Sequence, residues 1–79
     1  MWFVYIIECQ DKSLYTGITN NLEKRFKDHL AGKGGNYTRS HKPKKLIYKE
    51  VVSSRSAALK REYQIKRWPR EKKLHLIKP

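Results

Sequence analysis

The chain opens with two short apolar runs that predict a β-hairpin. Residues 2–7 (Trp-Phe-Val-Tyr-Ile-Ile) are β-branched and aromatic, and the same character resumes at residues 14–18 (Leu-Tyr-Thr-Gly-Ile). Side chains of this kind favour strands. The turn-like segment Gln10–Ser13 separates the two runs, so we expect two neighbouring strands joined by a tight turn.

Helical spacing of the apolar residues begins at Leu22. Leu22, Phe26 and Leu30 recur at every fourth position, which predicts a core-facing stripe along one side of a helix. The polar segment 19–21 (Thr-Asn-Asn) offers side chains that can cap the first turn of this helix. The stretch 32–43 that follows is glycine-rich and basic, and it reads as a loop.

A second strand-and-helix pattern follows this loop. Apolar residues between positions 46 and 52 predict a third strand, and Ser53 or Ser54 can cap a helix that runs from about residue 55 to residue 68. Pro69 ends that helix, because the residue before a proline is pushed out of helical geometry.

The last apolar positions predict a short C-terminal helix. Pro69 suits the first turn of this helix, which carries Leu74 and Ile77 on its apolar side. The predicted order is therefore β-β-α-β-α-α. We expect an α+β fold in which helices flank a three-stranded antiparallel sheet, with residues 1–79 forming a single domain.

The charge of the chain is strongly asymmetric. Lys and Arg number 19 against 7 Asp and Glu; residues 1–32 are balanced at four of each sign, whereas residues 33–79 carry fifteen basic and three acidic side chains. A cationic surface of this kind attracts polyanions through phosphate contacts. We expect a nucleic-acid partner, DNA rather than RNA, and no obligate protein partner. The candidate contact residues are Lys33, Tyr37, Arg39, Lys42 and Lys66. Tyr37 either stacks on an exposed base or packs within its turn.

The chain carries no targeting signal that we can detect. Its apolar start, residues 1–7, is too short for a signal sequence or a membrane span, and Glu8 follows at once. Cys9 is the only cysteine, so no intramolecular disulfide can form. These features predict a cytoplasmic protein.

Charged side chains lie at unexpected places on both longer predicted helices. Arg25 and His29 are four residues apart on the flank of the apolar stripe. They form either an ordinary boundary pair or part of a functional site. Glu62 lies on the apolar stripe of the other helix, between Ala58 and Ile65. A buried carboxylate needs a partner. The partner is either a cation such as Arg25 or a Mg²⁺ ion.

The hairpin contributes two tyrosines that can share a face. Tyr5 and Tyr15 lie on its two strands, across the turn from one another, and both can point to the same side as cross-strand neighbours. Taken alone, they are ordinary core aromatics. Their combination with Arg25, His29 and Glu62 makes Tyr5 and Tyr15 candidate site residues.

Taken in order, these residues resemble the GIY-YIG endonuclease superfamily. The runs Val4-Tyr5-Ile6 and Tyr15-Thr16-Gly17, the helix with Arg25 and His29, and Glu62 on a later helix all match its pattern. The resemblance extends from residue 2 to about residue 77 and is greatest to the small stand-alone bacterial branch, whose members are mostly uncharacterised.

The resemblance implies hydrolysis of a phosphodiester by water with the help of one weakly held Mg²⁺ or Mn²⁺ ion. Tyr5 and Tyr15 would orient or deprotonate the water, and His29 would act as general base. Arg25 would bind the scissile phosphate, and Glu62 would hold the metal.

Two polar residues that many members carry have no match here. Ile18 stands where a lysine is frequent, and residues 72–74 (Lys-Lys-Leu) replace an asparagine. We therefore consider two functions: a metal-dependent endonuclease acting on DNA, or a non-catalytic nucleic-acid binding module that keeps the fold. A small ribosome-associated protein that binds RNA is a third interpretation. The presence of Glu62 favours the enzyme, because a protein that only binds a polyanion has no use for a carboxylate that faces it.

Overall fold

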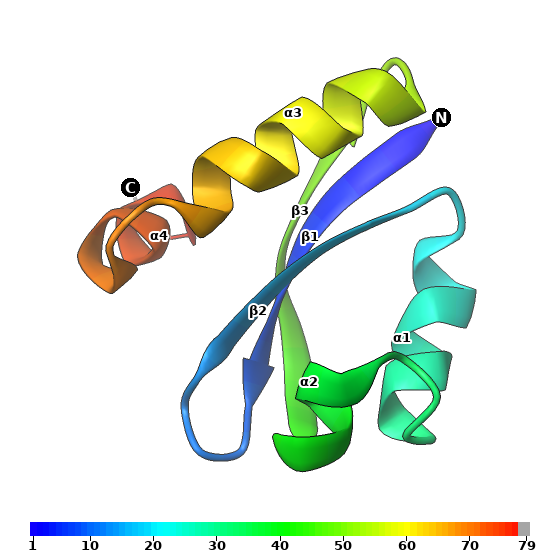
Figure 1. Ribbon diagram of the computed structural model, residues 1–79, viewed down its shortest axis with the longest axis vertical. Coiled ribbons are helices and arrows are strands. Elements are labelled where there is room, and N and C mark those ends of the chain that lie inside the picture. Colours follow the sequence, from blue (N-terminus) through cyan, green and yellow to red (C-terminus); the bar gives the residue numbers. More distant parts are fainter. Residues whose placement is uncertain (78–79) are drawn as a thin grey trace.

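A three-stranded antiparallel sheet forms the centre of the molecule (Figure 1). The computed structural model describes residues 1–77. Strands β1 (Trp2–Cys9), β2 (Leu14–Thr19) and β3 (Pro43–Val52) lie in the order β2-β1-β3. The predicted hairpin is confirmed, because β1 and β2 pair directly with Tyr5 opposite Gly17.

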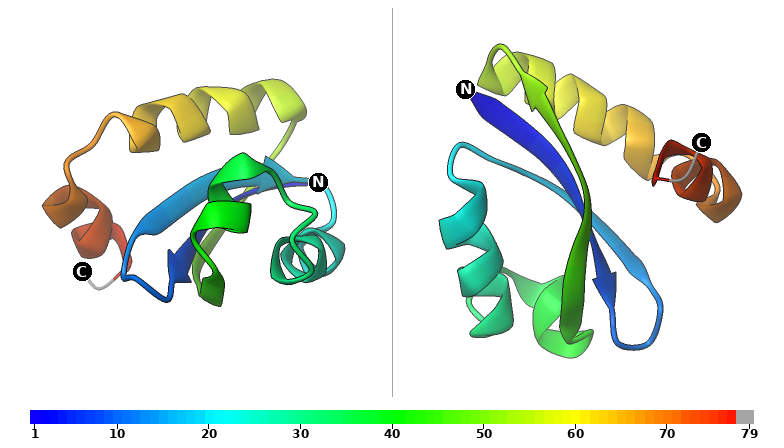
Figure 2. Two further views of the ribbon diagram at one scale, coloured as in Figure 1. Left: turned by 60° about the horizontal axis from the view of Figure 1, so that its bottom comes forward. Right: turned by 180° about the vertical axis from the view of Figure 1, so that it is seen from behind.

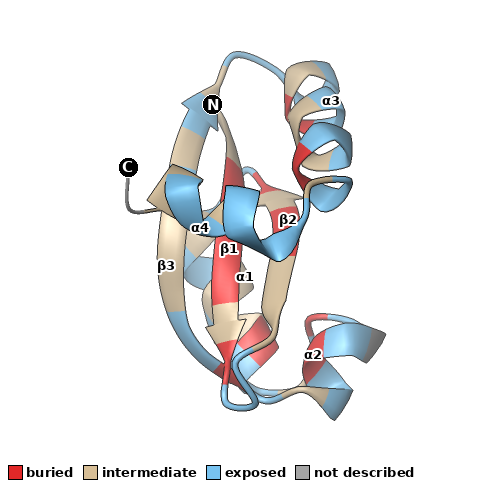
Figure 3. Ribbon diagram, turned by 90° about the vertical axis from the view of Figure 1, so that its left-hand side faces the viewer, coloured by how far each residue is buried: buried red, intermediate tan, exposed pale blue. Residues whose placement is uncertain are grey.

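Helices cover both faces of this sheet. They are α1 (Leu22–Leu30), α2 (Asn36–Ser40), α3 (Arg55–Lys66) and α4 (Arg70–Ile77). Figure 2 shows α1 and α3 on opposite sides of the sheet. Seen along the sheet in Figure 3, α4 lies in front of the strands, α1 lies behind them, and α3 runs beside β2. The predicted α+β architecture is therefore confirmed.

Strand β1 is buried on both faces, because it lies between the other two strands. Val4 and Ile6 point towards α3, where they pack with Ala58 and Ile65. The alternate residues, starting at Tyr5, point to the other face and pack against α1. This double burial explains why the first run is continuously apolar instead of alternating.

The predicted helix starts are confirmed. Asn21 caps α1 by accepting a hydrogen bond from the backbone nitrogen of Lys24 at 3.1 Å. Ser54 caps α3 in the same way, with its hydroxyl oxygen 3.1 Å from the backbone nitrogen of Ala57. Helix α3 ends two residues earlier than expected, at Lys66, and α4 begins directly after Pro69.

The segment predicted as a loop contains a short helix. Helix α2 follows Gly35, whose φ of 125° lies in a region that other residues rarely adopt. Five residues without an apolar repeat give too little periodicity to reveal a helix in the sequence. Strand β3 is also longer than the apolar run predicted, beginning at Pro43.

The predicted core stripe of α1 is wrong at one position. Leu30 is 55% exposed, whereas its neighbour His29 is fully buried. The helix is rotated so that the imidazole, instead of the isobutyl group, points inward beneath α2. Burial of a polar ring is tolerated here because both of its nitrogens have hydrogen-bond partners.

Two smaller points concern the single cysteine and the lengths of the helices. The thiol of Cys9 is buried in the cluster on the α1 face, and burial raises its pKa. Within residues 1–77, no helix has the length and apolar character needed to cross a bilayer.

Candidate active site

Tyr5 and Tyr15 share the face of the sheet that α1 covers. Their ring centroids are 6.4 Å apart. Gly17, directly opposite Tyr5 in the ladder, makes room for the Tyr5 side chain, since a Cβ atom there would lie 2.5 Å from the Tyr5 hydroxyl oxygen. A glycine is therefore required at position 17, because the Tyr5 side chain fills the space that a larger residue would need.

His29 is hydrogen-bonded through both ring nitrogens. Its Nε2 lies 2.8 Å from the Tyr5 hydroxyl, and its Nδ1 lies 2.8 Å from the hydroxyl of Thr38 on α2. Gly34 packs flat against the ring, because a Cβ atom at this position would overlap Nδ1. Burial, and secondly the charge of Arg25, lower the pKa of His29 to about 4. The imidazole is therefore neutral near pH 7.

Arg25 is held by the same glycine-rich segment. A terminal guanidinium nitrogen of Arg25 donates to the carbonyl oxygen of Gly34 at 2.8 Å. Burial raises the pKa of Tyr5 to about 12, and interaction with the Arg25 guanidinium opposes this rise without overcoming it. Tyr5 is thus a protonated phenol with a cation beside it.

Glu62 belongs to α3, which runs beside β2 (Figure 3). Its negative charge contributes to the raised pKa of Tyr5. One of its carboxylate oxygens lies 3.3 Å from the ammonium of Lys66, which in turn lies 5.9 Å from the centroid of the Tyr15 ring. The structure thus places Arg25 and Glu62 within electrostatic range of Tyr5, whose ring also packs against Tyr15 and His29.

Tyr15 also begins a stack of aromatic rings that the sequence did not reveal. Tyr37 of α2 stacks on Tyr15 with centroids 5.5 Å apart, and His41 stacks on Tyr37 at 4.2 Å. The far nitrogen of His41 lies 3.7 Å from a carboxylate oxygen of Asp11 in the hairpin turn. The Tyr37 ring therefore packs against two aromatic neighbours while it stays 37% exposed.

Comparisons with known proteins identify the family of this chain. The model of the GIY-YIG catalytic domain matches residues 1–75. The chain belongs to the GIY-YIG family.

Similar proteins cover nearly the whole GIY-YIG domain. A UPF0213 protein of Syntrophus aciditrophicus is 56% identical over 96% of this chain and 88% of its own length. A UPF0213 protein of Staphylococcus haemolyticus is 51% identical over 95% of this chain and 92% of its own. The solution NMR structure of a UPF0213 protein from Bacillus halodurans has a TM-score of 0.61 and 41% identity over 98% of this chain and 83% of that one.

The structure places the two positions at which the chain departs from the family pattern, Ile18 and the stretch 72–74. Ile18 points to the α3 face and packs with the apolar cluster around Val4 and Ile6, so no cation enters the site from that position. Leu74 is 41% exposed on α4, away from Glu62. The cation beside the carboxylate of this GIY-YIG domain is instead Lys66.

Basic side chains lie behind the buried histidine. Arg39 and Lys42 line a hollow of about 580 Å³ whose floor includes His29 and Thr38. Lys33 is exposed on the loop that leads to α2. These positions put positive charge within reach of the site, and their role in binding nucleic acid stays a prediction.

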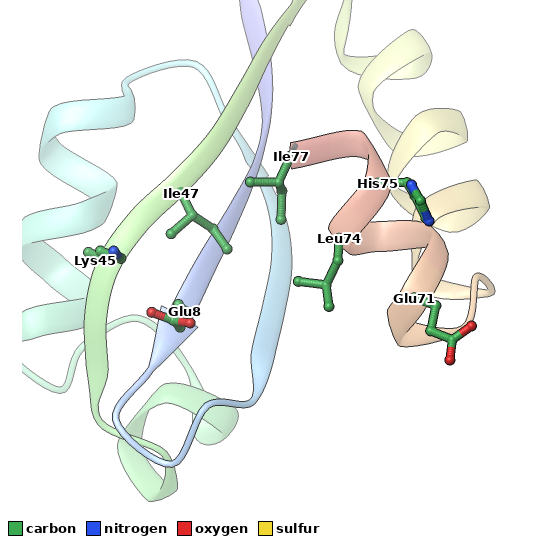
Figure 4. A pocket seen from close by; sticks show the side chains of 7 residues that line it. All are labelled: Glu8, Lys45, Ile47, Glu71, Leu74, His75 and Ile77. Atoms are coloured by element: carbon green, nitrogen blue, oxygen red, sulfur yellow. The ribbon is translucent and has the colours of Figure 1, made fainter. Parts of the chain in front are cut away.

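A second hollow lies on the opposite face of the GIY-YIG domain, between α4 and the sheet (Figure 4). Its volume is about 480 Å³, and it is lined by Glu8, Lys45, Ile47, Glu71, Leu74, His75 and Ile77. Its lining combines aliphatic side chains with two carboxylates and with the side chains of Lys45 and His75. The hollow therefore lacks the concentration of positive charge that a nucleic-acid backbone requires.

Proposed function

We propose that this GIY-YIG domain hydrolyses phosphodiester bonds of nucleic acid, most readily DNA, with the help of one divalent ion held by Glu62. The observation that carries this proposal is the continuous hydrogen-bonded chain from Tyr5 through His29 to Thr38, with Arg25 beside it and the charge of Glu62 reaching it. An ordinary core would not place these polar groups around one phenol. The family match supports the same reaction class.

The geometry changes the role expected for His29. Its ring is fully buried and both nitrogens are occupied, so it cannot contact a water at the phosphate directly. We assign the contact with water to the Tyr5 oxygen, and because the Tyr5 side chain is itself only 1% exposed, this contact requires that substrate binding opens the site around the phenol. The proposed role requires the tautomer in which the Tyr5 hydroxyl donates to Nε2 of His29 and Nδ1–H donates to the Thr38 hydroxyl.

Phosphate binding would prepare this pair for proton transfer. With pKa values of about 12 and about 4, the proton stays on Tyr5 in the free protein. After burial, the charge of Arg25 is the next cause that lowers the pKa of His29. A phosphate bound to Arg25 neutralises that charge and raises the pKa of the imidazole. Tyr5 can then pass its proton to Nε2 while it takes one from the attacking water.

Glu62 would offer a divalent ion one carboxylate, which is enough only for a weakly held ion. Within residues 1–77, no group of three or more His, Cys, Asp or Glu side chains is placed to hold a metal. Mg²⁺ is commonly bound through one or two carboxylates, with waters and substrate phosphate completing its coordination. Such an ion supplies positive charge to the phosphate as bond order changes. Glu62 would hold it, and Arg25 would orient the phosphate.

The test is cleavage of labelled duplex, single-stranded and branched DNA in Mg²⁺ or Mn²⁺ against EDTA. Glu62→Gln should abolish cleavage while DNA binding is unchanged or stronger. Arg25→Ala should reduce the rate by about 10²–10³, as expected for one transition-state donor. Glu23→Gln is the matched control, because Glu23 forms a similar pair with Lys27 at 3.3 Å on an exposed part of α1.

The alternative function is a binding module in which Glu62 is only the structural partner of Lys66. This outcome would be recognised by metal-independent binding of every DNA form without cleavage. Glu62→Gln would then lower the melting temperature, and Arg25→Ala would have no effect beyond a small loss of affinity.

A further inference from the structure

Among the lysines that form ion pairs within residues 1–77, Lys66 differs in how far it and its partner are buried. The pairs Lys24–Asp28 and Lys27–Glu23 are also four residues apart, but their lysines are 73–74% exposed and they lie on the outer side of α1. The Lys66 side chain is 50% exposed and its partner Glu62 only 19%. A carboxylate removed from water to this degree depends more strongly on a counter-charge.

The ammonium of Lys66 also lies against the site. It is 3.3 Å from one oxygen of Glu62 and 5.9 Å from the centre of the Tyr15 ring. Lys66 therefore pairs with one oxygen of the carboxylate that the proposed reaction assigns to a divalent ion. A divalent ion bound at either oxygen of this carboxylate would be repelled by the ammonium beside it.

We propose that Lys66 is a built-in counter-cation that keeps Glu62 neutralised until nucleic acid arrives, so that the divalent ion and nucleic acid bind cooperatively. This inference rests on the proposed function, since it takes Glu62 as the metal-holding group. A phosphate entering beside Arg25 offers the long, half-exposed Lys66 side chain a second anion. Lys66 moves to this phosphate, and the Glu62 carboxylate is released for the ion.

The proposal requires a reciprocal coupling. If nucleic acid strengthens metal binding by releasing Glu62 from Lys66, metal must strengthen nucleic-acid binding by the same factor. Without Lys66 the carboxylate is available at all times, so metal affinity rises and the coupling weakens. Lys66 is thus a positioning residue whose effect appears in binding, before any bond is cleaved.

The experiment measures Mn²⁺ binding by electron paramagnetic resonance, with and without a phosphorothioate DNA oligonucleotide that resists cleavage. The variants are Lys66→Met, which keeps length and removes charge, and Lys27→Met as matched control from the exposed pair on α1. Glu62→Gln, alone and with the oligonucleotide, gives the background of other Mn²⁺ sites.

Without oligonucleotide, Lys66→Met should bind Mn²⁺ about fivefold more tightly than the wild type, within the range of ordinary coupling energies. Addition of the oligonucleotide should strengthen Mn²⁺ binding by the wild type and by Lys27→Met, and much less by Lys66→Met. Equal affinity and equal enhancement in all three proteins would overturn the proposal, as would the absence of any Glu62-dependent binding. DNA cleavage is scored separately: coupling without cleavage would reject the nuclease alone, and cleavage without coupling would reject only the role of Lys66.

Discussion

Both faces of the sheet bury apolar side chains of the central strand, but they differ in the polar groups buried beside them. The face towards α3 buries Val4 and Ile6 against Ala58 and Ile65, and none of these side chains has a polar atom. The face towards α1 and α2 buries the imidazole of His29, which is linked to Tyr5 and Thr38.

This difference separates stability from chemistry within one strand. An aliphatic cluster gains free energy from every methylene removed from water. A buried polar chain contributes little net stability, because its hydrogen bonds replace those made to water, but it becomes costly when one partner is lost. Ile6 and Tyr5 are neighbours in sequence, but substitutions at these two positions should have different effects on stability and on cleavage.

The largest expected effect is on the aliphatic face. Ile6→Ala should lower the free energy of unfolding by about 2–5 kcal/mol, because it removes a fully buried side chain and leaves a cavity. Tyr5→Phe should cost about 1–3 kcal/mol by leaving Nε2 of His29 without a partner, and should abolish cleavage in protein that is still folded. Urea denaturation measures both variants.

Val51→Ala is the control for this pair, since Val51 is 56% exposed on β3 and its truncation should change stability by no more than about 0.5 kcal/mol. An Ile6→Ala protein as stable as this control would remove the distinction between the two faces.

The polar face should also make stability depend on pH. The pKa of His29 is about 4 in the folded protein, against an ordinary value of 6.5. Protonation therefore favours the unfolded chain, and the stabilisation is complete above about pH 6.5 and lost as pH falls to about 4. The loss from this group is about 3 kcal/mol, given the size of the shift.

Two measurements follow this titration. Urea denaturation at successive pH values should show the slope in the wild type and its reduction in His29→Gln. An NMR titration that resolves His29 from His41 and His75 gives its pKa directly. A His29 signal that titrates near pH 6.5 would mean that the ring is open to water and that the polar face is not closed.

Much of this fold could be predicted from the sequence because its signals are local. The hairpin, the caps Asn21 and Ser54, and the apolar positions Ala58 and Ile65 depend on neighbours within a few residues. The candidate residues could be named for another reason, namely their resemblance to a family pattern. Neither kind of signal describes how α1 is rotated, and so Leu30 was wrongly placed in the core.

The parts that could not be predicted depend on contacts across the chain. His29 is buried because Gly34 and Thr38, from a segment that reads as a loop, close over its ring. Lys66 could not be singled out as the partner of Glu62, because the chain offers 19 basic residues as possible partners. The packing of Tyr37 against Tyr15 and His41 requires α2, which has no periodic signal of its own.

A moderate effect is expected where the polar chain ends. Thr38→Val keeps the shape of the side chain and removes the partner of His29 Nδ1, so it should lower stability by about 1–2 kcal/mol, the range for an unsatisfied buried group. Thr38→Ser keeps the hydroxyl and should retain the tautomer of His29, which nitrogen NMR shifts of the ring report. If Val and Ser give the same tautomer and the same loss, the hydroxyl has no role beyond packing.

The smallest effect is expected at the outer edge of the polar face, at Tyr37. The ring is 37% exposed, and it packs against Tyr15 and His41 with centroids 5.5 and 4.2 Å away. A base that stacked on the ring would compete with these contacts. Tyr37→Leu should therefore cost no more than about 0.5–1.5 kcal/mol of stability, as expected for an aromatic pair.

The same variant distinguishes a packed ring from a base-stacking one by its effect on DNA affinity. Base stacking on an aromatic side chain is worth about 1–3 kcal/mol, so its loss would weaken binding of single-stranded DNA by roughly five- to 150-fold at every salt concentration. We expect instead a change smaller than about twofold for Tyr37→Leu, because the ring is already occupied. Replacing both Arg39 and Lys42 by Gln should weaken binding more at about 50 mM salt than at about 200 mM, since each lost phosphate contact reduces the salt dependence. Fluorescence anisotropy at the two salt concentrations separates these outcomes. A large, salt-independent loss in Tyr37→Leu would show that His41 yields its place to a base and that α2 opens when nucleic acid binds.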